Sequence, residues 1–398
     1  MLERLLNATL RTAIARRWLI VAAAILISLW GVLSVTRMPL EVFPPFAPPQ
    51  VEIQTSAVGL APEEVEARIT VPIEAVVNGL PGVETVRSSS KVGLSMVQVV
   101  FAQDADILRA RQAVAERLQQ IGSDLPPNAS APEISPLVSP LGTILQYAFT
   151  LRGDGPTTPM DLHRLVSLTF RNQVLAVPGV AQVTIYGGDE PQQQVLLDPQ
   201  ELQLRNVSLQ AVAEGVAAAS STAPGGFLIA GGRERLIRPL GQATGERDLA
   251  SAVIHDQAGA PLPLTAVAGV RQAPAFKRGD ASLDGRQAVV LMVNKQPDVD
   301  TPRVTRGVEE RVAALRRNLP ADIEVTRTFR QASFIDAAIR NVSSSLLQGI
   351  VIVSVVMVLF LMNWRTAVIT LSAIPLSLLI GLMLMHGFGL QINTMTLG

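Results

Sequence analysis

Methionine is the residue type through which this chain could bind a soft metal ion. The sequence contains no cysteine, and its histidines (His163, His255 and His386) stand far apart, so thiolate ligands are excluded and a two-histidine site within one element is not supported. A thioether suits Cu(I) or Ag(I), but methionine also fills gaps between packed helices, and the residues alone leave both roles open. Five methionines lie in or beside apolar stretches: Met357, Met362, Met383, Met385 and Met395.

Other chemistry is largely missing from the sequence. There is no G-x-x-x-x-G-K-[ST] loop for nucleotide phosphates, and the three long apolar stretches carry no carboxylate that could relay protons across a membrane. We therefore predict no catalytic residue, no cofactor and no proton-carrying residue within residues 1–398. The formal net charge is zero and no basic stripe occurs, so nucleic acid is not an expected partner.

Three uncharged apolar stretches, residues 18–35, 343–362 and 366–385, are long enough to be membrane-spanning helices. Eighteen helical residues at ~1.5 Å each extend about 27 Å, close to the hydrocarbon thickness of a bilayer. A cleaved signal peptide is the other interpretation of the first stretch. Residues 389–398 begin a fourth apolar segment without completing it, so we expect the sequence to be a portion of a longer chain.

Positive charges predict the orientation of these stretches. Arg11, Arg16 and Arg17 precede the first stretch, and Arg365 lies in the short turn between the second and third. Because cytoplasmic loops are enriched in Lys and Arg, both positions are expected on the cytoplasmic side. Residues from about 37 to 340 are then expected outside the cytoplasm.

The segment between the apolar stretches repeats itself, and an insertion splits the second copy. Residues 80–83 (Leu-Pro-Gly-Val) correspond to residues 177–180 (Val-Pro-Gly-Val), and in each copy an aspartate, Asp106 or Asp300, is followed 20 positions later by a proline. The glycine and the aspartate are 24 positions apart in the first copy and 121 in the second, so the insertion has about 97 residues. Duplicated units between hydrophobic spans suggest a transport protein.

Each copy is predicted to be a split β-α-β unit, because strand and helix periodicities follow the order β-α-β-β-α-β. In the first copy we expect strands at residues 51–55, 83–88, 94–101 and after Pro132, and helices from Pro62 and at 107–121. In the second copy we expect strands at residues 144–150, 180–186, 288–294 and 323–329, and helices at 160–175 and 303–317.

The insertion, roughly residues 199–276, combines a helical pattern at 208–219 with a glycine-rich ribbon. In the ribbon, two short apolar strands bracketed by double glycines favour a projecting hairpin. Its apolar side chains need a partner surface or must pack on the insertion itself. The candidate contact residues are Pro224, Gly225, Gly226, Phe227, Leu228 and Ile229.

This order of elements resembles the N-terminal half of a resistance-nodulation-division (RND) efflux permease. The resemblance covers the whole chain. Residues 87–95 and 109–114 are similar to the heavy-metal branch of this superfamily, and the multidrug branch is the close alternative. The motifs that carry the general resemblance occur in the family's order at residues 38–44, 79–83, 125–126, 197–199, 374–376 and 392–398.

The resemblance implies an α+β membrane protein, in which transmembrane helices carry periplasmic ferredoxin-like (split β-α-β) porter subdomains with an inserted docking subdomain. The implied parts are a cytoplasmic N-terminus and first transmembrane helix (1–36), a first porter subdomain (37–140), a split second porter subdomain (141–198 and 277–330), a docking insert (199–276), a coupling helix (331–342), second and third transmembrane helices (343–362 and 366–388) and the start of a fourth (389–398).

The resemblance also implies a function: proton-driven export of heavy-metal cations across the bacterial inner membrane, which is transport and not enzyme catalysis. The implied partners are further copies in a homotrimer, a periplasmic adaptor, an outer-membrane channel, membrane lipid and the metal cation. The hairpin at residues 224–229 would reach a neighbouring protomer. Met395 matches by position a methionine that copper and silver pumps of the family use to relay metal, whereas the family's proton-relay acids lie beyond Gly398. Export of organic solutes and a truncated, non-transporting scaffold are the alternatives.

Overall fold

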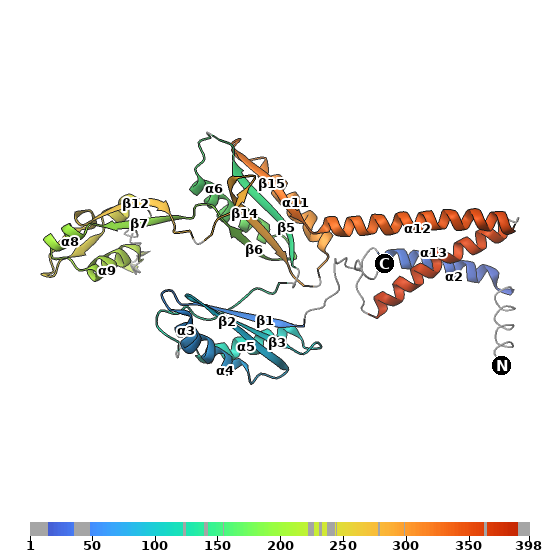
Figure 1. Cartoon of the computed structure of the whole chain (residues 1–398), viewed down its shortest axis with the longest axis horizontal. Helices are drawn as coiled ribbons and strands as arrows, with labels where there is room; N and C mark the ends of the chain where they lie inside the picture. Colours follow the sequence, from blue (N-terminus) through green and yellow to red (C-terminus); the bar gives the residue numbers. More distant parts are fainter. Residues whose placement is uncertain are drawn as a thin grey trace.

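The computed structural model describes residues 15–35, 48–121, 125–138, 142–153, 155–221, 227–230, 233–236, 243, 245–277, 279–297, 299–361 and 364–388. Figure 1 shows an elongated molecule with two sheet-and-helix units in the middle. The inserted unit lies at one end, and three long helices lie at the other.

The first unit is a four-stranded antiparallel sheet in the order β2-β3-β1-β4, with helices on one face (Figure 1). Side chains alternate along its strands: Val51 and Ile53 of β1 are buried under the helices, whereas Glu52 and Gln54 lie on the other face. The elements are β1 (Gln50–Ser56), α3 (Pro62–Val65), η1 (Glu66–Thr70), α4 (Val71–Val77), β2 (Val83–Lys91), β3 (Leu94–Phe101), α5 (Ile107–Ile121) and β4 (Glu133–Ile134).

The second unit has the same topology, with strands in the order β6-β14-β5-β15 and the short β13 (Ser282–Leu283) added beside β14. Phe149 and Phe170 meet edge to face in its core, with ring centroids 4.7 Å apart. The elements are β5 (Thr143–Leu151), α6 (Pro159–Leu165), η2 (Val166–Phe170), α7 (Arg171–Leu175), β6 (Val180–Tyr186), β14 (Arg286–Lys295), α11 (Thr301–Arg316) and β15 (Ile323–Arg330).

The pairing of these strands confirms the internal duplication. Val83 pairs with Phe101 in the first sheet, and Val180 pairs with Lys295 in the second, each followed by a register shift. The amide after each pair, that of Ala102 or Gln296, donates to the carbonyl of the glycine in the Pro-Gly-Val motif at 2.9 Å. The buried side chains of Phe101 and Lys295 therefore occupy equivalent places in the two copies.

The first helix of each copy differs from the plain α-helix that we predicted, because each contains a five-residue π segment, η1 or η2. In η1 the side-chain hydroxyl of Thr70 is buried and lies 2.8 Å from the hydroxyls of both Ser90 and Ser95. Helical periodicity alone does not reveal such a bulge, since one extra residue per turn leaves most apolar spacings unchanged.

A two-stranded ribbon connects the insertion to the second unit. Its strands, β7 and β12, pair along their full lengths. The sequence placed residues 191–197 in the second porter subdomain, but as β7 they pair with β12 of the insertion. The ribbon leads to a small separate core. The elements are β7 (Pro191–Leu197), α8 (Pro199–Leu204), α9 (Leu209–Ser220), α10 (Glu246–Ala250), β10 (Val253–His255), β11 (Pro261–Pro263), η3 (Leu264–Ala266) and β12 (Ala268–Pro274).

The insertion also carries the hairpin of β8 (Phe227–Ala230) and β9 (Arg233–Leu236), which pair antiparallel. The prediction of two apolar strands was wrong for the second strand, because β9 contains Arg233, Glu234 and Arg235. Pro224, Gly225 and Gly226 lie outside the described residues.

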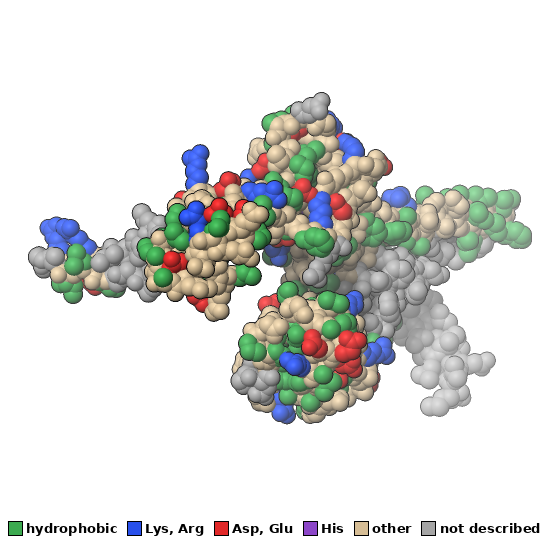
Figure 2. Space-filling view, turned by 60° about the vertical axis from the view of Figure 1, so that its left-hand side comes forward, with side chains coloured by type: hydrophobic (Ala, Val, Ile, Leu, Met, Phe, Trp, Pro, Cys, Tyr) green, Lys and Arg blue, Asp and Glu red, His purple; other side chains and the backbone are tan. Residues whose placement is uncertain are grey.

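Three helices form the remaining part: α2 (Arg17–Val35), α12 (Ala332–Leu361) and α13 (Trp364–Gly387). The predicted coupling helix and second apolar stretch are one continuous helix, α12. Among the described residues, one helix, Ala332–Phe360, is long and apolar enough to cross a membrane, and Trp18–Ser34 and Leu376–Met385 are shorter apolar helices. Most of the large apolar side chains of α12 are exposed, and Figure 2 shows its surface as largely hydrophobic. The helix α2 approaches α13 closely at Gly31.

Candidate coupling junction

The sheet of the second unit passes into the long helix α12 with a single residue between them. β15 ends at Arg330, which pairs with Leu145 of β5, and α12 begins at Ala332. The backbone amide of the intervening Gln331 donates to the carbonyl of Ile144 at 2.9 Å. Because the connection is tied to the sheet, a movement of the sheet must move the start of α12.

Ion pairs add a second tie between the unit and α12. The Arg330 guanidinium donates to the Asp336 carboxylate in α12 at 2.6 Å and to the Glu309 carboxylate in α11 at 3.1 Å. Arg327 pairs with the same Glu309 oxygen. Arg330 thus connects α11, β15 and α12, and with 22% of its side chain exposed it is partly shielded from water.

The carboxylates around Arg330 stabilise the charged form of its side chain. The hydrogen bond with Asp336, followed by the charge of Glu309, raises the pKa of Arg330 above its ordinary value. Burial, followed by the charge of Glu309, raises the pKa of the nearby Tyr147 hydroxyl to about 12. Arg330 therefore stays charged and Tyr147 stays neutral at physiological pH.

Apolar contacts complete the junction. Ala332 and Ile335, in the first turn of α12, are 0% and 2% exposed. The rings of Phe329 in β15 and Phe334 in α12 lie 6.4 Å apart. The first turn of α12 is thus packed on the sheet, and the arrangement can transmit a displacement between the sheet and the rest of α12.

A second ionic cluster, which we call the insert root, lies where the ribbon leaves the second unit. The Lys277 ammonium pairs with the carboxylates of Asp189 and Asp280, one from each chain segment of the root. Asp280 also accepts the backbone amide of Gly188 at 3.2 Å, and the Gln287 amide donates to Asp189 at 2.9 Å. The outgoing and returning segments are thereby tied to each other and to β14.

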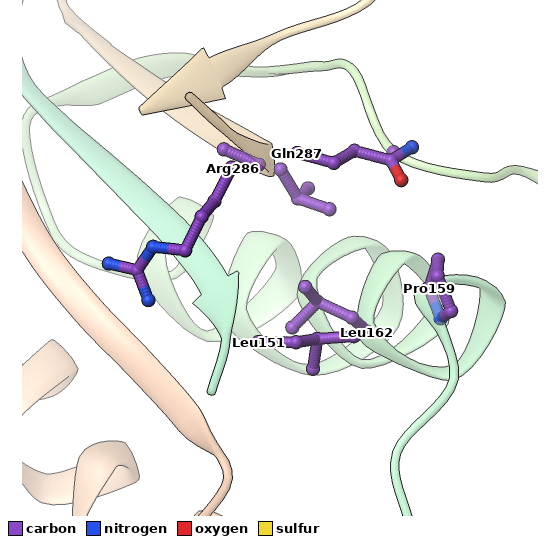
Figure 3. A pocket seen from close by; sticks show the side chains of 8 residues that line it. Leu151, Pro159, Leu162, Arg286 and Gln287 are labelled. Carbon is purple, nitrogen blue, oxygen red and sulfur yellow. The ribbon is translucent and has the colours of Figure 1, made fainter. Parts of the chain in front are cut away.

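A small hollow lies beside the insert root in the second unit (Figure 3). It has a volume of about 130 Å³, and its labelled apolar side chains, Leu151, Pro159 and Leu162, come from β5 and α6. Arg286 at its rim is engaged with Glu324. The volume is well below the ~300 Å³ at which drug-sized ligand sites begin, so this hollow is not a site for a large organic solute.

Of the predicted site residues, the structure describes Phe227, Leu228 and Ile229, which lie on β8 of the insertion and not at the junction. Met395 lies outside the described residues, and so does half of the hairpin set, whereas Phe227, Leu228 and Ile229 are 65%, 51% and 76% exposed on β8. The His163 ring nitrogen Nδ1 lies 3.2 Å from the carbonyl oxygen of Gly187, which fits a structural role. Within the part of the chain that the structure describes, no group of three or more His, Cys, Asp or Glu side chains could hold a metal ion.

Sequence reasoning missed the junction residues Glu309, Arg330 and Asp336. The available signal was an arginine and an aspartate six positions apart where a predicted strand meets a long apolar helix. The sequence does not show that Glu309 of α11 also contacts Arg330, because this contact forms only in the tertiary structure.

The fold defines a class: a duplicated sheet-and-helix protein in which a continuous helix connects a porter-like unit to an apolar helical part. Residues 9–398 match the sequence profile of the AcrB/AcrD/AcrF family, and the chain belongs to this family. This match, together with the relatives described next, confirms the predicted resemblance to the N-terminal half of an RND permease of the heavy-metal branch.

Individual relatives agree with this assignment. The chain is 32% identical to the cation efflux system protein CzcA of Alcaligenes sp. (strain CT14) over 406 residues, which covers all of this chain and 38% of that protein. It is 32% identical to the cation efflux system protein CusA of Escherichia coli (strain K12), over 98% of this chain and 37% of that protein. The crystal structure of a heavy metal efflux pump (crystal form I) matches 97% of this chain and 39% of its own, with a TM-score of 0.86 and 29% identity. The chain therefore spans less than two fifths of the length of these relatives.

Proposed function

We propose that the chain is the N-terminal portion of an inner-membrane permease that exports heavy-metal cations by proton antiport. The observation that carries the proposal is the junction, in which Arg330 ties the second porter-like unit to a 30-residue helix long and apolar enough to enter a membrane. Such a tie is what a transporter needs in order to link movements in the membrane to opening of the periplasmic units. The similarity to proteins named for cation efflux supplies the substrate class.

We infer the wider arrangement from the same similarity. α2, α12 and α13 are transmembrane helices of a multi-pass protein, and residues from about 37 to 340 are periplasmic. The two sheet units act as porter subdomains and the insertion acts as the docking subdomain. The complete permease forms a homotrimer and works with a periplasmic adaptor and an outer-membrane channel, and Met395 is a candidate position in the membrane relay of metal.

The substrate class is tested by metal accumulation in cells. The full-length permease is expressed with its cognate adaptor and channel in a bacterium that lacks its own metal exporters. Cells are loaded with Zn²⁺, Co²⁺, Cd²⁺, Cu⁺ or Ag⁺, and cellular metal is measured by mass spectrometry. We expect lower accumulation of at least one of these cations and raised resistance to it. Unchanged accumulation of all five, with the permease present in the membrane, contradicts the proposal.

The hairpin is proposed to contact a neighbouring copy. Phe227 and Ile229 lie on one face of β8, and Leu228 lies on the other, opposite Arg235. An isolated two-stranded hairpin is marginally stable in water, and exposed apolar side chains of this kind favour a partner surface. The partner surface should therefore offer apolar side chains to one face and acidic side chains to the other.

Substitution of Phe227 and Ile229, the two apolar residues that share one face of β8, tests this contact. Phe227→Asp with Ile229→Asp in the full-length permease should shift the oligomer toward monomer in native mass spectrometry, because it buries charge in the interface. Leu204→Asp is the matched control, since Leu204 is a 77% exposed apolar residue of the same insertion. An unchanged oligomer with the doubly substituted hairpin contradicts the assignment.

A further inference from the structure

The two copies hold their π segments against the sheet by different contacts. The last residue of η1 is Thr70, and the last residue of η2 is Phe170. Phe170 packs edge to face on Phe149 of β5 inside an apolar core. Thr70 is 1% exposed and its side chain contacts hydroxyl groups of β2 and β3 instead.

The strand register shows that these hydroxyl groups occupy the places of apolar side chains in the second copy. The last residues of β3 and β14 are equivalent, and Ser95 and Val289 each lie six positions before them. Directly opposite these two residues are Thr55 on β1 and Phe149 on β5. A buried polar cluster in the first unit thus replaces part of the aromatic core of the second.

The number of protons fixes the donors in this cluster. The Thr70 hydroxyl donates its one proton to the carbonyl oxygen of Val65, five positions back, at 3.3 Å. The hydroxyls of Ser90 and Ser95, each 2.8 Å from that of Thr70, must then donate to it. The cluster therefore supports the π geometry of the helix and ties η1 to two strands.

Thr55 offers Ser95 a second partner. The Thr55 side chain is 1% exposed, and its hydroxyl has no hydrogen-bond partner among the described residues. The two residues are directly opposite on the helix-covered face of the sheet, so their Cβ atoms are ~5 Å apart. Rotation about χ1 of Ser95 can therefore move its hydroxyl from Thr70 to Thr55. The two arrangements contain equal numbers of hydrogen bonds, so hydrogen bonding does not strongly favour either.

We propose that Thr55, Thr70 and Ser95 form a latch on the first helix of the first unit. The latch is closed when Ser95 donates to Thr70, as in the structure, and open when Ser95 turns to Thr55. Two arrangements of similar free energy are both populated, and the open one removes one of the two hydrogen bonds that hold η1 on the sheet. Phe149 and Phe170 have no hydroxyl to exchange, so the equivalent helix of the second unit stays fixed. The inference goes beyond the proposed function, and its test requires no cation.

The test is amide hydrogen exchange of the full-length permease, measured by mass spectrometry. Thr55→Val keeps the shape of the side chain and removes the open-state partner, so exchange at residues 66–77 should slow about two- to tenfold, the factor that corresponds to one hydrogen bond. Thr70→Val removes the latch, so exchange there should become faster. Ser90→Ala removes one hydrogen bond at a half-buried position and should have the same direction of effect if Thr70→Val does not fold.

Thr150→Val is the matched control, because Thr150 in the second sheet is 0% exposed and its hydroxyl also has no partner among the described residues. Opposite effects of Thr55→Val and Thr70→Val at residues 66–77, with exchange at residues 166–175 unchanged in all variants, support the latch. Unchanged exchange in Thr55→Val overturns it, because no open state is then populated. Faster exchange in Thr55→Val also overturns it, because Thr55 is then held by a buried water. Equal slowing by Thr150→Val at residues 166–175 would mean that loss of any buried hydroxyl stabilises the protein, and this too overturns the proposal.

Discussion

At the scale of single residues, Arg330 is the side chain on which the account depends most. It is the member of the junction that contacts both α11 and α12, through Glu309 and Asp336. Its removal leaves Glu309 with Arg327 as a partner, while the ion pair between Arg330 and Asp336 is lost. The unit should therefore keep its fold and lose its tie to the helix.

Arg330→Ala should lower metal export by roughly tenfold or more, because a charge-assisted hydrogen bond is worth ~1.5–3 kcal/mol and 1.4 kcal/mol corresponds to a factor of ten. Arg316→Ala, an exposed arginine in the last turn of α11, is the control. The measurement is initial cation uptake into inverted vesicles at equal protein content. Wild-type rates in the Arg330 variant would show that the ionic tie plays no part in transport.

The insert root gives a prediction about pH. The hydrogen bond from Lys277 lowers the pKa of Asp280, and the hydrogen bonds to Asp189 and Asp280 raise the pKa of Lys277. A lowered carboxyl pKa stabilises the folded root above the unfolded pKa of ~3.9, and this contribution is lost as the pH falls through the still lower folded pKa. A raised lysine pKa contributes below the unfolded pKa of ~10.4 and is lost as the pH rises through the folded pKa. The root is therefore fully tied at neutral pH.

Amide hydrogen exchange at Gly188 reports on this tie, because its N–H donates to Asp280. We expect Asp280→Asn to speed exchange at Gly188 at pH 7, and we expect the wild-type protection factor there, corrected for intrinsic exchange rates, to fall below about pH 4. Asp284→Asn, in the neighbouring turn at φ 51°, is the control, since Asn tolerates that backbone. Equal protection at Gly188 in the two variants would count against the tie.

At the scale of elements, glycines determine how closely the insert root packs on the second sheet. Gly187 has φ 73°, and a Cβ there would stand 2.7 Å from the Ala288 carbonyl oxygen and from the Ala281 amide nitrogen. A side chain at this position is therefore excluded by backbone conformation and by contact with backbone atoms that cannot move aside.

Gly187→Ala should destabilise the second unit by about 2–4 kcal/mol, the sum expected from backbone strain and overpacking. Gly285→Ala separates the two causes, because Gly285 has φ 76° but open space around it, so only the strain applies. Thermal unfolding of the full-length protein should show a clearly lower midpoint for Gly187→Ala than for Gly285→Ala. Equal midpoints would mean that the close contact contributes nothing.

The elements also show what the sequence could and could not predict. Strands and helices of both copies were predictable because their side chains alternate or recur with regular spacing, as in Val51 and Ile53 of β1. The partner of β7 was not, because the pairing of residues 191–197 with 268–274 depends on contacts about 75 positions apart. The ion pairs of the junction were not predictable for the same reason, because Glu309 contacts Arg330 only when α11 packs against the sheet.

At the scale of the whole molecule, we propose that the two sheet-and-helix units and the apolar helices move together, because α12 connects the second unit to the apolar helices. Its first turn is packed on the sheet, and residues 350–360 near its other end are almost all apolar and mostly exposed. Two glycines inserted between Asn341 and Val342 would keep the junction and the apolar segment but place a flexible hinge between them.

The most direct measurement is cation-driven proton flux through the purified full-length permease in proteoliposomes, with a pH-sensitive dye inside and a cation gradient imposed across the membrane. The account predicts flux with the wild-type protein that depends on the cation, and flux reduced to the empty-vesicle level with the two-glycine insertion, although both proteins retain cation binding. Proton flux that is independent of every cation tested, or that survives the insertion at wild-type rate, would contradict the claim that this chain couples a metal-carrying porter to the membrane through α12.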